Sequence, residues 1–141
     1  MQNNPWLIAA GSMSAAAALA HLAVIAGGPD WYRFFGAGEG VARAAERGEL
    51  VAPLVTIGIA SVLLIWSAYA FSGAGVIPRL PLLRLGLVTI TAIYLVRALW
   101  IIPGLPLLGR SATFVLISSA IVLVVGVTHA IGVWTAWRTL R

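Results

Sequence analysis

Four long apolar segments constrain the fold of this 141-residue chain more than any other feature. We place them at residues about 5–27, 51–73, 82–102 and 112–136, each with roughly 20 or more mainly apolar residues, enough for a helix to cross about 30 Å of hydrocarbon. The sequence therefore predicts one all-α integral membrane domain. We expect a four-helix up-down transmembrane bundle, with an interfacial amphipathic insert, residues 28–50, between the first two spans.

The composition supports a membrane protein and excludes several other classes. Hydrophobic residues make up 61% of the chain and charged residues 9%, whereas a soluble domain carries roughly 25% charged residues. The chain has no cysteine, which excludes disulfides and metal ligation by sulfur. The net charge of +5 comes from arginines dispersed around the apolar segments, so we expect membrane lipids as partners and no nucleic acid. No metal or other cofactor is predicted.

The first apolar segment has the features of a retained helix. No positive residue precedes it, and it is longer than the roughly 7–15 apolar residues of a signal peptide. Gly11, Ser12 and Ser14 lie within it, and small residues at this spacing let helix backbones approach closely in lipid.

The insert contains every carboxylate of the chain: Asp30, Glu39, Glu46 and Glu49. Gly27, Gly28 and Pro29 end the first helix, and Asp30 is predicted to cap a new short one. The aromatic run that follows, residues 31–35, is typical of the membrane–water boundary. Pairs of opposite charge at helical spacing predict a second short helix over residues 39–47.

The arginine distribution gives the predicted orientation. An even number of spans places both termini and the linker 73–84 on one side, with Arg79, Arg84, Arg138 and Arg141, and leaves Arg33, Arg43, Arg47 and Arg110 on the other. The counts are equal. Because the acids of the insert partly neutralise its arginines, we expect the termini in the cytoplasm, in a bacterial inner membrane.

Three ionisable residues lie inside the apolar segments, where charge is costly and usually functional. From the rise of 1.5 Å per residue, His21 lies about 7–8 Å and Arg97 about 6 Å from the midplane toward the insert. His129 lies about 7–8 Å toward the termini. The two histidines therefore differ in depth by about 15 Å, which argues against a haem held by both.

The predicted ligand site lies at the insert end of the bundle. Tyr94, Arg97 and Trp100 share one face of the third span, and His21 lies at a similar depth. Two interpretations are open. Asp30 or Glu39 forms a buried salt bridge with Arg97 and pins the insert to the bundle. Alternatively, the residues His21, Asp30, Glu39, Tyr94, Arg97 and Trp100 line a pocket for a small anionic or polar-headed amphiphile such as a lipid or quinone.

His129 is predicted to lie where two helices pack closely. Gly126 and Gly132 lie three residues to either side of it, so its helix face is expected to pack closely against a neighbour. We expect a neutral imidazole that hydrogen-bonds across to Ser67 or Tyr69 of the second span; the alternative is that His129 forms a ligand or proton site.

In size the chain resembles the small multidrug transporters, which depend on a carboxylate inside the first span. No acid lies there, so proton-coupled drug antiport is disfavoured. The size also resembles the membrane-associated eicosanoid and glutathione enzymes, but their arginine- and asparagine-bearing motif is not matched by residues 45–49, AERGE. Nothing in the sequence specifies a reaction. The alternative to an amphiphile-binding protein is an accessory or structural subunit that docks on a larger membrane complex, or a homo-oligomer.

Overall fold

The computed structural model describes residues 3–100 and 112–140, and these contain helices and no strands. The helices are α1 (Pro5–Gly27), α2 (Pro29–Phe34), α3 (Glu39–Glu46), α4 (Val51–Gly73), α5 (Leu83–Trp100) and α6 (Ala112–Ala136). The predicted all-α fold is confirmed for this part of the chain. The predicted end of the third apolar segment, at about residue 102, lies outside the described residues.

Three of the described helices, α1, α4 and α6, are long and apolar enough to cross a membrane. Each covers the residues that the apolar pattern predicts. α5 has 18 residues and reaches the last described residue before the gap. Its role as a fourth span, and the up-down bundle as a whole, stay predictions.

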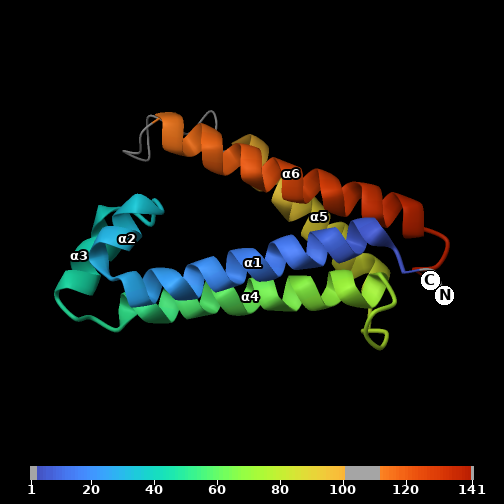
Figure 1. Ribbon diagram of the computed structural model, residues 1–141, viewed down its shortest axis with the longest axis horizontal. Coiled ribbons are helices and arrows are strands. Elements are labelled where there is room, and N and C mark those ends of the chain that lie inside the picture. Colours follow the sequence, from blue (N-terminus) through green and yellow to red (C-terminus); the bar gives the residue numbers. More distant parts are fainter. Residues whose placement is uncertain (1–2, 101–111, 141) are drawn as a thin grey trace.

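The helices form two pairs. α1 lies against α4 along its length, and α5 packs on α6 (Figure 1). α6 also contacts α1, which joins the pairs. Both chain ends lie at one end of the molecule, here called the terminus end, and α2 and α3 lie at the other, the insert end (Figure 1).

Asn4 ties the start of α1 to α6. Its side-chain oxygen accepts a hydrogen bond from the Leu7 backbone N–H at 3.1 Å, and Pro5 occupies the first turn. This arrangement satisfies a donor that a helix start leaves unpaired. The Asn4 amide also donates to Thr135 Oγ1 at 2.9 Å. The cap of one helix is therefore also a contact between two helices.

Small residues let the helix backbones approach closely, as the sequence predicts. Ser67 Oγ of α4 donates to the backbone carbonyl of Gly11 in α1 at 2.8 Å. A Cβ added at Gly132 of α6 would lie 2.6 Å from the Leu7 side chain and 3.2 Å from its backbone nitrogen. Such distances leave no room for a side chain at Gly132, so α1 and α6 touch there backbone to side chain.

The buried apolar residues form three clusters along the long axis. The cluster at the terminus end takes residues from all four long helices: Leu7, Ala10, Ala70, Ala74, Leu83, Leu87, Val133, Ala136 and Leu140. The central cluster also joins all four: Ala18, Ala60, Leu63, Ile90, Tyr94 and Val125. At the insert end the described cluster contains only α1, α4 and the insert: Val24, Tyr32, Ala42, Ala44 and Ala52. The described core therefore includes α5 and α6 at the terminus end and at the centre, but not at the insert end.

The turn between α4 and α5 is held by side chains. Ser72 Oγ accepts from the Leu80 N–H at 2.9 Å and donates to the Pro78 carbonyl at 3.0 Å. Tyr69 Oη donates to the Pro81 carbonyl at 3.1 Å. In the same turn, the Leu82 backbone has a left-handed conformation, with φ 52°. This conformation costs a non-glycine residue roughly 1–2 kcal/mol.

A first prediction tests the α1–α6 contact. We expect Gly132→Ala to lower the unfolding free energy by roughly 1–3 kcal/mol, because an added methyl overpacks the contact with Leu7. The matched control is Gly58→Ala, since a Cβ at Gly58 meets nothing within 4 Å; it should be neutral or stabilising. Thermal unfolding in mild detergent measures both. Equal melting temperatures for the two variants would contradict the contact.

Candidate functional site

The insert is folded and packed, as the sequence predicts. α3 (Glu39–Glu46) ends within a residue of its predicted limit. The Tyr32 ring is buried between Val24, Ala42 and Ala52, so α2 and α3 rest on the ends of α1 and α4. One detail differs from the prediction: Gly28, at φ 74°, occupies the N-cap position of α2 and Pro29 the first turn. Asp30 therefore lies in the first turn, where a carboxylate is favourable beside the positive helix end.

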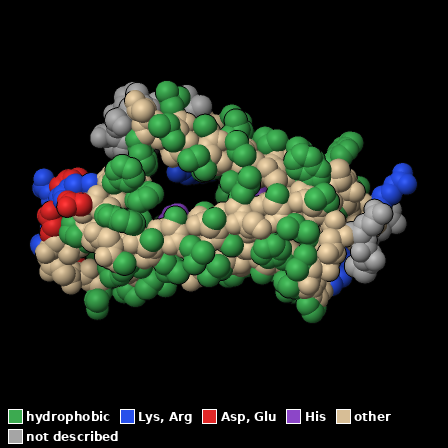
Figure 2. Space-filling view, viewed as in Figure 1, with side chains coloured by type: hydrophobic (Ala, Val, Ile, Leu, Met, Phe, Trp, Pro, Cys, Tyr) green, Lys and Arg blue, Asp and Glu red, His purple; other side chains and the backbone are tan. Residues whose placement is uncertain are grey.

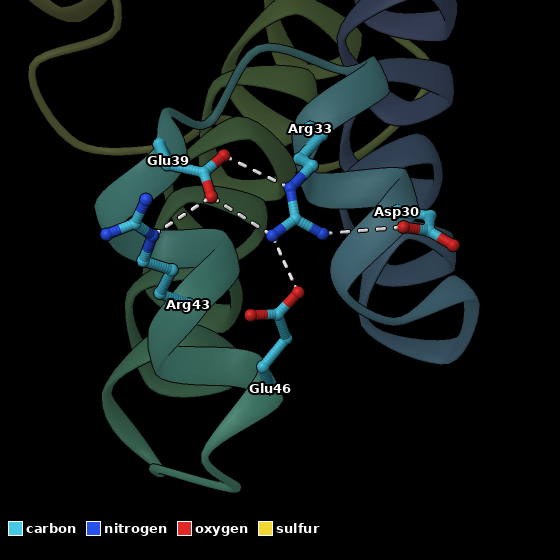
Figure 3. Close-up of polar contacts among 5 residues, drawn as sticks. All are labelled: Asp30, Arg33, Glu39, Arg43 and Glu46. Carbon is cyan, nitrogen blue, oxygen red and sulfur yellow. Dashed lines mark hydrogen bonds and ion pairs between the residues drawn. The ribbon is translucent and has the colours of Figure 1, made fainter.

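The charged residues of the insert form an ion cluster centred on Arg33 (Figure 3). Its guanidinium donates to Glu39 Oε2 at 3.1 Å, to Glu46 Oε1 at 2.6 Å and to Asp30 Oδ1 at 3.4 Å. Arg43 adds a bond of 3.1 Å to Glu39. Arg33 thereby links α2 to both turns of α3, which holds the two short helices together.

The cluster shifts the titration of its members. Hydrogen bonds from Arg33, and then from Arg43, lower the pKa of Glu39 to about 2. The same bonds from Glu39 and Glu46 raise the pKa of Arg33 above its usual value. Arg47 donates to Glu49 and lowers the pKa of that carboxyl. All these groups are partly exposed, so solvent and salt screen the interactions.

The predicted buried salt bridge between Arg97 and an insert acid is wrong, because neither acid is buried. Asp30 has a side chain that is 95% exposed, and Glu39 is 52% exposed and bonded to two insert arginines. Arg97 is itself exposed on α5. Short-range pairs within the insert satisfy the carboxylates at less desolvation cost than a pair carried into the bundle.

Tyr94 lies in the centre of the molecule and not in an insert-side cluster. Its hydroxyl shares a 2.9 Å hydrogen bond with Ser14 Oγ of α1. Its ring packs edge-on against Trp66 of α4 and 5.0 Å from the His129 ring of α6. One side chain of α5 thus contacts the other three long helices. The side chain of Trp100, its predicted neighbour, lies outside the described residues.

The predicted hydrogen-bond partners of His129 are wrong. Ser67 and Tyr69 bond to the backbone of Gly11 and Pro81 instead. His129 is fully buried and its Nδ1 donates to the Val125 carbonyl of its own helix at 2.9 Å. The Val125 carbonyl lies one helical turn before His129, so it is closer to the ring than an acceptor on a neighbouring helix. Within the described residues its Nε2 has no hydrogen-bond partner.

His21 and Arg97 lie on the helices that flank an opening at the insert end. Figure 2 shows the molecule hollowed between α1, the insert and the first half of α6, with histidine and arginine side chains at its edge. His21 is half-buried, and its Nδ1 donates to the Ala17 carbonyl at 2.7 Å. The insert meets α6 beyond the opening, because a Cβ on Gly36 would lie 2.2 Å from the Phe114 ring.

Sequence reasoning missed a groove at the terminus end. It is a shallow, open groove of about 850 Å³, lined by Arg79, Arg84, Trp137 and several leucines. The available signal was the placement of these residues: Arg84 lies in the first turn of α5 and Trp137 directly follows α6. Both lie on the side of the termini, and antiparallel neighbours bring such positions together.

No protein-family model, curated protein or solved structure matches this chain. Within the described residues, no three or more His, Asp or Glu side chains form a group that could hold a metal ion.

A second prediction concerns pH and the insert. Because the pKa of Glu39 is about 2 in the folded insert and its ordinary value is 4.5, its contribution is fully present above pH 4.5 and is lost as the pH falls toward 2. A nitroxide on Gly40→Cys, a position with open space around it, should become more mobile over this range. Its electron paramagnetic resonance spectrum measures the change.

The control for that titration is a pair of acid variants. Glu39→Gln should make the label mobile already at pH 7. Asp30→Asn should leave the titration unchanged, because the Asp30 side chain is 95% exposed. A label whose mobility does not change between pH 4.5 and 2 would refute the coupling.

A third prediction tests the central hydrogen bond. Tyr94→Phe and Ser14→Ala should each lower the unfolding free energy by about 0.5–1.5 kcal/mol. The double variant should cost less than the sum, with a coupling of about 0.6 kcal/mol. Ser61→Ala is the control, since Ser61 is exposed and its hydroxyl donates to the Ile57 carbonyl of its own helix. Unfolding in mixed micelles measures all four, and strict additivity would show that the bond does not form.

Proposed function

We propose that this chain is a small multi-pass protein of the bacterial inner membrane, with α5 as a fourth span beside α1, α4 and α6. Three helices of membrane-crossing length support this. So does the shared location of the termini, which an even number of spans requires (Figure 1). The arginine distribution favours termini on the cytoplasmic side.

We further propose that the protein binds an amphiphile with an anionic or polar head in the opening at the insert end. The observation that supports this most directly is the hollow between α1, the insert and α6 (Figure 2). The described core at that end joins the insert to α1 and α4 only. A lipid-accessible opening between helix pairs is a common location for an apolar ligand tail.

Arg97 and His21 have complementary roles in this proposal. Arg97 is an exposed cation near the end of an apolar helix, and its planar guanidinium can bind a carboxylate or phosphate with two parallel hydrogen bonds. His21 uses Nδ1 for the Ala17 carbonyl, so Nε2 is the ring nitrogen that would bind a polar head. The apolar walls of α1 and α6 would take the tail.

A fourth prediction tests this function. Oleate, added to the purified protein at about 100 times its dissociation constant, should raise the melting temperature by roughly 5–10 °C. Arg97→Gln should abolish the shift and His21→Phe should reduce it. Arg43→Gln is the matched control, because it removes the same charge from the exposed face of α3. The wild-type shift should persist in that variant.

The alternative is an accessory subunit that docks on a larger membrane complex. Such a subunit would show no oleate-dependent shift, would co-purify with a partner and would lose stability without it. The wild-type protein, extracted in mild detergent and examined by size exclusion and mass spectrometry, distinguishes the two functions.

A further inference from the structure

The two histidines of the chain use the same ring nitrogen in the same way. His21 Nδ1 lies 2.7 Å from the Ala17 carbonyl oxygen, and His129 Nδ1 lies 2.9 Å from that of Val125. A carbonyl oxygen can only accept a hydrogen bond, so each Nδ1 carries a proton. In a neutral imidazole the other ring nitrogen is then an acceptor. Neither Nε2 can therefore donate a hydrogen bond while its ring is neutral.

The acids of the chain are engaged elsewhere and do not hold His21 as a cation. The four carboxylates are all described, and each pairs with an arginine of the insert: Asp30, Glu39 and Glu46 with Arg33, and Glu49 with Arg47. An imidazolium at His21 would be a charge inside an apolar helix with no carboxylate beside it, which is costly. The structure therefore favours the neutral ring, with Nε2 as an acceptor.

The two histidines differ in how accessible they are. His129 is fully buried, and within the described residues its Nε2 has no hydrogen-bond partner. His21 is half-buried, and histidine side-chain surface lies at the edge of the opening at the insert end (Figure 2). The described core at that end contains residues of α1, α4 and the insert only. His21 Nε2 is thus the acceptor that a molecule in the opening can reach, and His129 is an enclosed counterpart with the same bonding.

We propose that the ligand of the opening carries a hydroxyl group beside its anionic group, and that this hydroxyl donates to His21 Nε2. The proposal rests on the ligand-binding function proposed above and names the chemical class of the head. A head that offers only acceptors would place two lone pairs against each other in apolar surroundings, where an unmade hydrogen bond is costly. A hydroxyl supplies the missing proton. His21 would therefore select a hydroxylated acid over a simple fatty acid.

The test compares three acids of equal chain length on the full protein in mild detergent. They are oleate, α-hydroxyoleate and α-methoxyoleate, and the methoxy group adds an oxygen without a donor. Titration calorimetry at about pH 8, where an ordinary imidazole is neutral, measures binding. The wild type should bind α-hydroxyoleate about 2- to 10-fold more tightly than oleate, the net value of one hydrogen bond. α-Methoxyoleate should bind no more tightly than oleate, and His21→Phe should lose the preference for the hydroxyl.

A second measurement needs no variant that must fold. Because the chain has two histidines, ¹⁵N-labelled histidine gives one Nε2 signal from each in a nuclear magnetic resonance spectrum. Before ligand is added, both rings should show the proton on Nδ1. α-Hydroxyoleate should shift the Nε2 signal of His21 and leave that of His129 unchanged, since His129 is enclosed. α-Methoxyoleate should not reproduce the shift.

Several outcomes would overturn the proposal. A proton on Nε2 of His21, an equal shift at His129, or a preference that survives in His21→Phe would each contradict the hydrogen bond. Equal affinity for oleate and α-hydroxyoleate, with both still raising the melting temperature, would refute the hydroxyl and leave the ligand-binding function standing. An unchanged melting temperature with all three acids would refute that function and this inference together.

Discussion

The close approach of small residues on α1 and α6 is the contact on which the arrangement of the long helices depends. Gly132 lets Leu7 pack against the α6 backbone, and Gly11 brings a carbonyl within reach of Ser67. In lipid, helices gain little from apolar burial alone, so backbone proximity and interhelical hydrogen bonds decide which faces meet. The Asn4 side chain adds a hydrogen bond from the start of α1 to α6, and the Tyr94 hydroxyl adds one between α5 and α1. The hydrogen bonds between long helices made by Asn4, Ser67 and Tyr94 therefore lie at the terminus end and the centre of the molecule.

The helix bounds could be predicted because strong local signals mark them. Gly27, Gly28 and Pro29 interrupt one apolar run, and Pro5 begins it within the first helical turn. The helical insert could be predicted from its alternating charges. These signals depend on residues near one another in sequence, so they need no knowledge of which helices are neighbours.

The partners of the polar side chains could not be predicted in the same way. The depth of Arg97 suggested a buried bridge, but Arg33 lies closer to the acids in sequence and meets them near water at less desolvation cost. His129 took the carbonyl of its own helix in place of a partner on α4. Depth along a helix follows from residue number, whereas the direction of a side chain depends on helix rotation. The Arg84–Trp137 groove escaped prediction because it needs two helices side by side.

The buried core contains α6 residues at the terminus end and at the centre, whereas the described core at the insert end contains none. α6 meets the other helices tightly near Gly132, close to its carboxyl end, and has 25 residues, so it is about 37 Å long. If α5 and α6 rotated together by about 5° around that contact, the far end of α6 would move by roughly 3 Å for a helix of this length, enough to disturb the contact between Phe114 and Gly36. A small repacking at Leu7 would therefore widen or narrow the opening at the insert end. In the proposed ligand-binding function, a substitution beside Leu7 would therefore change access to the opening without contacting the ligand.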